Sequence, residues 1–264
     1  KLRKKLEFHI KKGRARVEMK NIKIVYQYDG SKFEGFQRQN KGKTVQGEIE
    51  KILFQRFSEK VNMISSGRTD KGVHATGQVS NFLIEKNIPV EAIRSQINKN
   101  LYGEVKILEI EEVGKEFNSR FDAQRRIYLY IMKKKEEITP FEASYIAGIK
   151  DSVDGKILEK IMKVYIGKHD FSSFMKKDKA LRNTIREIYG VKCVSDENTG
   201  EIKIEISGSS FLKTMVRIMI GSALAVYFKE KDEDYIIKKL ENPDADGGKI
   251  LAPAEGLYLY RVDY

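Results

Sequence analysis

The sequence predicts an α+β protein with a mostly antiparallel sheet. In both halves of the chain, apolar residues recur at strand spacing in some segments and at helix spacing in others, without the strict strand–helix alternation of a doubly wound parallel sheet. Residues 22–113 follow the order strand, helix, strand, strand, helix, strand, which is that of a ferredoxin-like unit. Because no low-complexity linker interrupts the chain, we expect the two halves to share one sheet.

Local signals assign the elements of the first half. Residues 21–30 alternate apolar and polar side chains and end in an Asp-Gly turn, which predicts a half-buried strand. Thr44 has the side chain of a helix N-cap, and the apolar residues that follow it up to Phe57 fall on one helical face. Pro89 opens a second helix. Further strands are predicted at residues 61–65, 77–85 and 105–113.

The second half repeats this mixture of elements. Its most apolar segment, residues 210–228, predicts a buried helix. A turn of sequence DENTG joins two alternating runs into a hairpin. The predicted strands are residues 125–132, 185–194, 201–207 and 256–264, and the predicted helices are residues 155–166, 210–228 and 232–240.

The charge balance points to a polyanionic partner. The formal net charge is +12 over 264 residues, and nucleic acid is the usual partner of so basic a chain. Residues 1–19 form a basic leader with eight Lys and Arg against two Glu, which is half of the net charge. The leader has too few apolar positions for a membrane span or a secretory signal. We therefore expect no membrane partner, and we expect the chemistry not to need the leader.

The residue types offer no support for a metal or a cofactor. Cys193 is the one cysteine, which excludes an internal disulfide and a cysteine-based zinc site and fits a reducing cytoplasm. The three histidines are scattered, and neither a Walker loop nor a G-x-G-x-x-G fingerprint occurs. We expect no metal site and no bound cofactor.

The stretch SGRTDKGVHATGQVSNF places an arginine, an aspartate, a lysine and a histidine within seven residues, from Arg68 to His74. Gly67 and Gly72 lie on either side of the first three charges and allow a sharp turn close to a ligand. On such a turn Asp70 could serve as a reactive carboxylate, while Arg68 neutralises a phosphate or stacks on a base. Solvated hairpin turns use the same residues, so the spacing alone leaves both interpretations open.

Two features of the second half also have two interpretations. Arg217 lies within the apolar segment 210–228, where a buried guanidinium would need a carboxylate partner, whereas a snorkelling arginine at the helix edge would not. Tyr128 and Tyr130 share one face of the basic strand RRIYLYIMKKK, which is typical of an RNA-stacking platform. An ordinary cross-strand aromatic pair is the commoner alternative.

Taken together, these stretches resemble the motifs of the TruA-type tRNA pseudouridine synthases. GRTDKGVHATGQVSNF is similar to the family signature that contains the catalytic aspartate. YQYDGSKFEGFQRQ is similar to the first-strand motif, with Phe36 where a tryptophan is usual, and FDAQRRIYLY to the segment with the active-site tyrosine. GKHDFSSF, FLKTMVRIMIGS and APAEGLYLYRVDY are similar to three further motifs. The resemblance runs from about residue 21 to Tyr264 and leaves out the leader.

The resemblance implies roles for single residues. Asp70 would be the nucleophile, and Arg217 would pair with it and keep it ionised. Tyr128 would pack against the target base and help remove its C5 proton, and Arg68 would help displace that base from its stack. The further substrate-binding residues that we expect within the matched motifs are Gly67, Lys71, His74 and Arg126.

The resemblance also implies a fold and a reaction. The fold would consist of two ferredoxin-like α/β halves, residues 20–115 with the catalytic aspartate and residues 116–264, around a continuous, mostly antiparallel sheet with a central active-site cleft. The reaction would isomerise uridine to pseudouridine at positions 38–40 of the tRNA anticodon stem-loop, in a cytoplasmic homodimer. A related synthase with other RNA targets, or a non-catalytic RNA-binding protein on this scaffold, remains an alternative.

Overall fold

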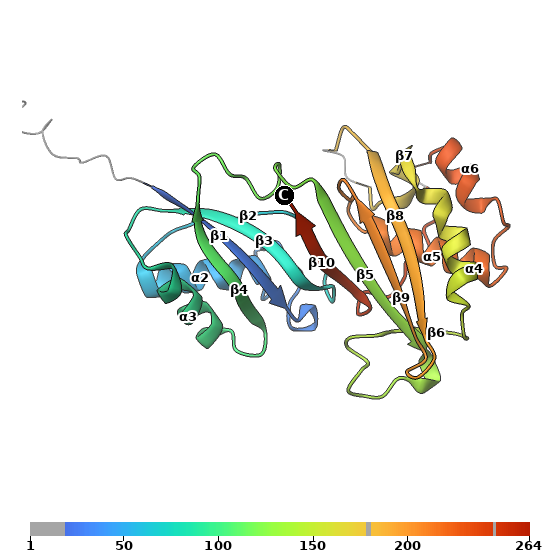
Figure 1. The fold of residues 1–264 in the computed structure, drawn as a ribbon, viewed down its shortest axis with the longest axis horizontal. Coiled ribbons are helices and arrows are strands. Elements are labelled where there is room, and N and C mark those ends of the chain that lie inside the picture. Colours follow the sequence, from blue (N-terminus) through green and yellow to red (C-terminus); the bar gives the residue numbers. More distant parts are fainter. Residues whose placement is uncertain (1–18, 178–180, 245–246) are drawn as a thin grey trace, which may run out of the picture.

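The structure is a computed structural model, and it describes residues 19–177, 181–244 and 247–264. The predicted basic leader lies outside the described residues, except for Met19. Strands and helices are mixed in both halves, so the predicted α+β class is confirmed (Figure 1). The strands are β1 (Lys20–Tyr28), β2 (Ile64–Ser65), β3 (His74–Ile84), β4 (Val105–Val113), β5 (Arg125–Lys134), β6 (Ala147–Ile149), β7 (Gly167–Asp170), β8 (Ile185–Asp196), β9 (Glu201–Gly208) and β10 (Leu257–Asp263). The helices are α2 (Val45–Phe57), α3 (Val90–Asn100), α4 (Gly155–Met162), α5 (Met215–Tyr227) and α6 (Tyr235–Glu241).

One sheet runs through the whole described chain in the order β4-β1-β3-β10-β5-β9-β8-β7, with β2 on β3 and β6 on β5. The C-terminal strand β10 joins the two halves, because it pairs with β3 on one side and with β5 on the other (Figure 1). Its contact with β3 is parallel and short, Tyr258 opposite His74 and Leu259 opposite Ala75. The contact with β5 is antiparallel and continues over most of β10. The prediction of a shared, mostly antiparallel sheet is therefore confirmed.

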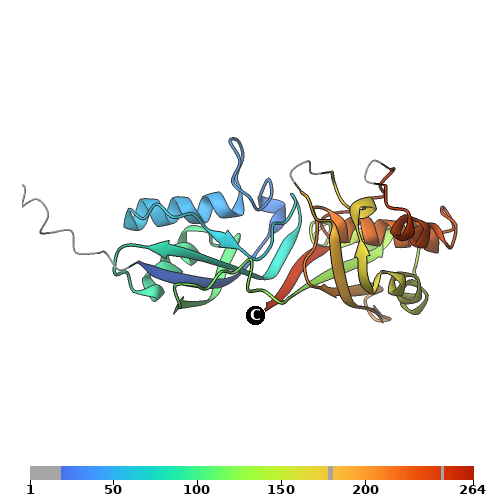
Figure 2. The same ribbon diagram turned by 90° about the horizontal axis from the view of Figure 1, so that it is seen from above.

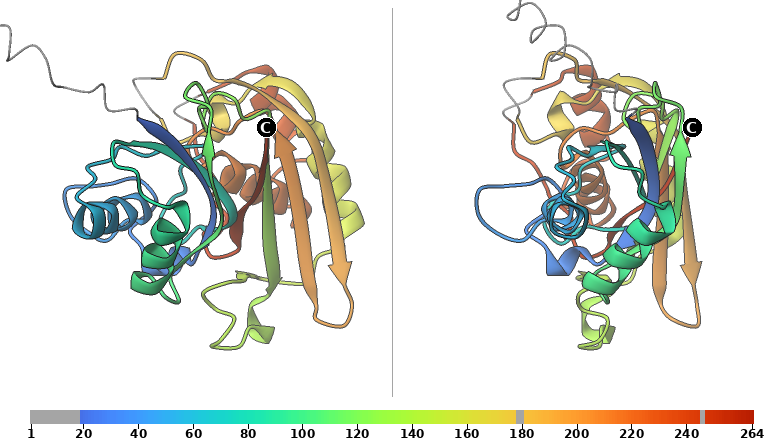
Figure 3. Two further views of the ribbon diagram at one scale, coloured as in Figure 1. Left: turned by 60° about the vertical axis from the view of Figure 1, so that its left-hand side comes forward. Right: turned by 90° about the vertical axis from the view of Figure 1, so that its left-hand side faces the viewer.

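The alternating strands and the capped helices form as the sequence predicts. In β1, Ile22, Ile24 and Tyr26 are fully buried. Thr44 caps α2, because its side chain accepts a hydrogen bond from the backbone of Gly47. Helices α2, α5 and α6 lie on the same side of the sheet (Figure 2). Figure 3 turns the end of the molecule with α2 and α3 toward the viewer, and both helices lie on the same side of β1.

Helix α5 is the most apolar element, and it begins five residues later than the sequence predicts. Residues 210–214 are not helical, because Thr214 has a φ of 62°, in the left-handed region. Eleven of the 13 residues of α5 are buried, while Arg217 is not among them. The segment from Phe211 to Thr214 is thereby free to line the junction between the halves.

Other boundaries also differ from the predictions. The helix predicted at 155–166 ends at Met162 and continues as a 3-10 turn, and the strand predicted at 61–65 shrinks to two residues. Strand β3 begins at His74, three residues before the predicted start. Strands β6 and β7 are too short to produce a periodic pattern, so the sequence did not predict them. Within the described ranges, no helix is both long and apolar enough to cross a membrane.

Candidate active site

The turn that carries Asp70 connects β2 to β3 and is fastened to the first half of the chain. The backbone N–H of Val73 donates to the carbonyl of Asp70 at 3.2 Å, which closes the turn, and Gly72 takes a φ of 80°. Thr69 is held twice, since its hydroxyl lies 2.8 Å from that of Tyr28 and its carbonyl accepts from the N–H of Phe36 at 3.1 Å. These bonds hold Asp70 at a defined place beside β10.

Arg217, the third residue of α5, faces Asp70 across the junction. Its Nη1 lies 3.7 Å from Oδ2 of Asp70, and the two side chains are 14% and 26% exposed. Its Nε donates to the carbonyl of Ala252 at 2.8 Å, and the N–H of Ala252 donates back to the carbonyl of Arg217 at 3.0 Å. A snorkelling arginine would be far more exposed, so the structure supports the paired alternative for this residue.

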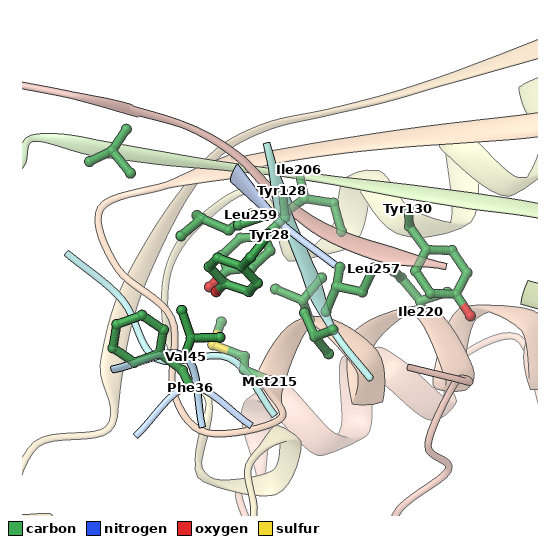
Figure 4. Packing of buried hydrophobic residues seen from close by; sticks show 14 of the residues in the cluster. Tyr28, Phe36, Val45, Tyr128, Tyr130, Ile206, Met215, Ile220, Leu257 and Leu259 are labelled. Carbon is green, nitrogen blue, oxygen red and sulfur yellow. The ribbon is translucent and has the colours of Figure 1, made fainter. Parts of the chain in front are cut away.

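Tyr128 on β5 forms the floor beside this pair. Its ring meets that of Phe211 edge-on, with centroids 5.0 Å apart, and its hydroxyl lies next to Gly67. Tyr28 of β1 and Tyr128 come together in the buried cluster between the halves (Figure 4). Burial raises the pKa of Tyr128 to about 12; the positive charge of Arg126 lowers that pKa and the negative charge of Asp70 raises it. The phenol is therefore neutral at neutral pH.

These side chains surround one small cavity of about 30 Å³. The cavity holds about two water molecules. Its charged members are Arg68, Asp70 and Arg217, and Arg68 is exposed at its mouth. The remaining lining residues are Thr69, Val73, Tyr128, Phe211, Leu212, Thr214, Met215, Val216 and Leu257. The structure thus brings together four residues from three distant segments of the sequence: Arg68 and Asp70, Tyr128, and Arg217.

Other predicted substrate-binding residues do not line this cavity. Lys71 is exposed and forms an ion pair with Glu34 at 2.8 Å. Gly67 lies near the hydroxyl of Tyr128; its φ is outside the left-handed region, and a Cβ there would meet only ordinary contacts at 3.7 Å. Arg126 is 7% exposed, and all the hydrogen bonds of its guanidinium go to backbone carbonyls.

His74 is buried on the other side of the turn, with both ring nitrogens engaged. Its Nδ1 accepts from the N–H of Gly30 at 3.0 Å, and its Nε2 lies 2.9 Å from the carbonyl of Ser144, to which it donates. Its ring stacks on Tyr258 with centroids 4.7 Å apart. Burial lowers the pKa of His74, against the opposing effect of the Asp29 carboxylate. This histidine acts as a structural link in the described chain and lines a separate cavity of about 470 Å³.

Several residues that line or support this cavity are not singled out by the sequence patterns. Phe211 and Leu212 counted only as positions of an apolar helix, and the left-handed Thr214 that turns them toward the cavity leaves no signal in the residue pattern. Tyr28 counted only as a strand residue, although it holds Thr69. Among the described residues, no group of three or more His, Cys, Asp or Glu side chains could hold a metal ion.

The chain is similar to several known proteins. A chain of a Cbf5-Nop10-Gar1 complex aligns with a TM-score of 0.41 and 12% identity, over 90% of this chain and 48% of that one. The family model described as tRNA pseudouridine synthase matches residues 24–122 and 161–264. The chain is 38% identical to tRNA pseudouridine synthase A of Pseudothermotoga lettingae, over 93% of this chain and 100% of that protein. It is 32% identical to tRNA pseudouridine synthase A 2 of Bacillus cereus, with the same two coverages. The family match and these two relatives show that this chain belongs to the tRNA pseudouridine synthase family.

Proposed function

We propose that this chain isomerises uridine to pseudouridine in tRNA, with Asp70 as the nucleophile. The observation that carries the proposal is the Asp70–Arg217 pair across the junction, in one cavity with Tyr128 and Arg68. In the reaction the bond between N1 and C1′ breaks, the uracil rotates, and a bond forms between C5 and C1′. C5 then loses its proton and N1 carries one, so the atoms balance without an oxidant or a reductant.

Asp70 meets the requirements of a nucleophile. It is partly exposed, so a reacting carbon can approach it, and the turn holds its backbone still. The guanidinium of Arg217 lies opposite the carboxylate and orients Oδ2 toward the cavity. Attack on the sugar and attack on the base both need these properties.

Tyr128 is suited to relay a proton, and not to act as a general base that is already ionised before the reaction. With a pKa of about 12, only about one phenol in 10⁵ is ionised at pH 7. The Asp70 charge is one cause of that raised pKa. When Asp70 forms a covalent bond it loses this charge, so the acidity of Tyr128 rises at the stage when the C5 proton must be moved. The ring also offers a flat surface to the base.

Arg68 is the residue best placed to admit the base. A stacked uridine must leave its helix to reach Asp70. The cavity holds about two water molecules, so a uracil ring enters only when lining side chains move. Arg68 is exposed at the mouth, and its guanidinium can stack on the neighbouring bases in place of the flipped one. We take residues 20–115 and 116–264 as the two halves whose junction forms this cleft.

The proposed substrate is the anticodon stem-loop at tRNA positions 38–40, in the cytoplasm. The motifs shared with the TruA-type enzymes support this choice, and the basic charge of the chain suits an RNA partner. The test is to incubate the purified protein with an unmodified tRNA transcript and to map pseudouridine by mass spectrometry. Pseudouridine at positions 38–40 is expected. Pseudouridine only elsewhere would favour a related synthase, and none at all would favour a non-catalytic RNA-binding protein.

We further propose that the protein works as a homodimer. Strands β5, β9 and β8 lie in front of α5 in Figure 1, and this face of the sheet bears apolar side chains between Lys192, Lys203 and Glu205. Leu129 and Ile131 are half-buried there, and Val194 is 47% exposed. A second copy would cover these side chains. Light scattering during size-exclusion chromatography should give twice the mass of one chain, and the mass of a single chain would refute the dimer.

A further inference from the structure

Arg126 on β5 is a buried cation whose donors are all engaged. The residue is 7% exposed. Its hydrogen bonds run from Nε to Ser66 (3.3 Å), from Nη1 to Ala123 (2.8 Å) and Ser209 (2.7 Å), and from Nη2 to Ser66 (3.2 Å) and Arg120 (2.6 Å). A guanidinium has five N–H donors, so these five bonds use them all. A phosphate could bind Arg126 only by displacing one of these carbonyls.

The carbonyls belong to three separate segments around the cavity. Ser66 begins the turn that carries Asp70. Ser209 begins the irregular segment that carries Phe211, the ring partner of Tyr128. The third segment, residues 114–124, connects β4 to β5. The Arg126 side chain therefore holds together the Asp70 turn, the Phe211 segment and the connection between the halves.

We infer that Arg126 is a positioning residue, which holds the Asp70 turn and the Phe211 segment in place against Tyr128. This inference rests on the proposed function. Arg126 and Tyr128 lie two residues apart on the same face of β5, so the strand that carries the proposed proton relay also carries the clamp. The role replaces the expected contact between Arg126 and the substrate, because the guanidinium has no donor left for one.

The charge of Arg126 supports this role as well. A buried cation close to Tyr128 lowers the pKa of the phenol and opposes the effect of Asp70. Lysine at position 126 would keep the charge but offer at most three donors, so it would release at least two of the five bonds. Methionine replaces only the aliphatic stem of the arginine, so it would remove both the charge and the five bonds.

The test compares Arg126→Lys and Arg126→Met with the wild type on an anticodon stem-loop RNA. Arg125→Lys is the matched control, because Arg125 is the neighbouring residue, is exposed, and contacts the Tyr189 ring instead. Because small misplacements of reacting groups cost up to about a hundredfold, kcat should fall by about that factor in Arg126→Met and by less in Arg126→Lys. KM and its salt dependence should stay within about threefold, since no phosphate contact is lost.

Amide hydrogen exchange gives a readout that does not depend on activity. In Arg126→Lys, peptides that cover residues 66–73 and 208–212 should exchange faster, whereas those of α3 should not change. Faster exchange everywhere, or no change in either segment, would overturn the inference. So would a raised KM with a weaker salt dependence and an unchanged kcat, which would mean that Arg126 contacts RNA. If the wild type forms no pseudouridine, the proposed function fails, and the exchange data alone then decide whether Arg126 clamps both segments.

Discussion

The pair of Asp70 and Arg217 permits a quantitative test by a double-mutant cycle. The variants are Asp70→Ala, Arg217→Ala and the double mutant, and the quantity compared is the free energy of unfolding. The Nη1–Oδ2 distance is 3.7 Å, and the side chains are 26% and 14% exposed. Exposed ion pairs couple by about 0.2–1 kcal/mol, whereas breaking a fully buried pair costs about 3–5 kcal/mol. Because water still reaches Asp70, we expect a coupling energy of about 1–2 kcal/mol.

Arg217→Ala should destabilise the protein by more than the coupling energy. The substitution also removes the Nε donor from the carbonyl of Ala252, a loss of about 1 kcal/mol. The single variant should therefore be destabilised by about 2–3 kcal/mol in total. When Asp70→Ala is added to Arg217→Ala, it should lower the free energy of unfolding by less than it does in the wild type, because it removes a carboxylate that no longer has its partner.

Urea unfolding followed by circular dichroism gives the free energy of unfolding of all four proteins. The dependence of this free energy on urea concentration should be the same in each of them. The matched control is the cycle on Glu91 and Arg94, whose ion pair has the same N–O distance of 3.7 Å but whose side chains are 70% and 38% exposed. That cycle should give a coupling energy of about 0–0.5 kcal/mol. If the Asp70 and Arg217 effects add within about 0.3 kcal/mol, the two side chains do not interact and the assignment of the pair is wrong.

Three further predictions concern turnover and pH. Asp70→Asn should keep the turn and bind tRNA as the wild type does. Its single-turnover rate should fall at least about a thousandfold, which corresponds to a barrier higher by roughly 4 kcal/mol. A rate within tenfold of the wild-type rate would mean that Asp70 is an ordinary turn residue. Tyr128→Phe keeps the ring against Phe211 and should still bind tRNA, but it should lose most of its rate because the hydroxyl is the proposed relay; near-normal rates would reduce Tyr128 to a stacking residue. Burial lowers the pKa of His74, against the Asp29 and Glu255 charges, so below about pH 6.5 the unfolded chain binds a proton that the folded chain does not. The free energy of unfolding, measured by urea titrations at several pH values, should therefore fall as the pH drops below about 6.5. His74→Asn should make this pH dependence weaker, and an identical pH dependence in both proteins would contradict the assignment.

Much of the fold follows from short stretches of sequence. The alternation in residues 21–28 determines which face of β1 is buried, because side chains on a strand point to opposite faces in turn. Thr44 determines where α2 begins, because a hydroxyl there satisfies a free backbone N–H. The motif around Asp70 was sufficient to single out the turn and its candidate residues. Each of these features depends on neighbours within a few positions.

Only the tertiary structure decided what those residues meet. The pairing of β10 with both β3 and β5, which joins the halves, depends on contacts between distant segments that no periodicity encodes. The left-handed Thr214, which delays α5 and turns Phe211 toward the cavity, is likewise invisible in an apolar pattern.

The arginines give the sharpest contrast between sequence and structure. In the sequence Arg68, Arg126 and Arg217 are three cations within family-like motifs. The structure leaves Arg68 exposed, pairs Arg217 with Asp70, and encloses Arg126 among carbonyls. Charge and spacing are the same for an exposed and a buried guanidinium, and what differs is which acceptors the folded chain brings within hydrogen-bond distance. The sequence by itself thus determined the kind of chemistry, and the packing of the two halves decided which cation faces solvent, which faces the carboxylate and which holds the walls.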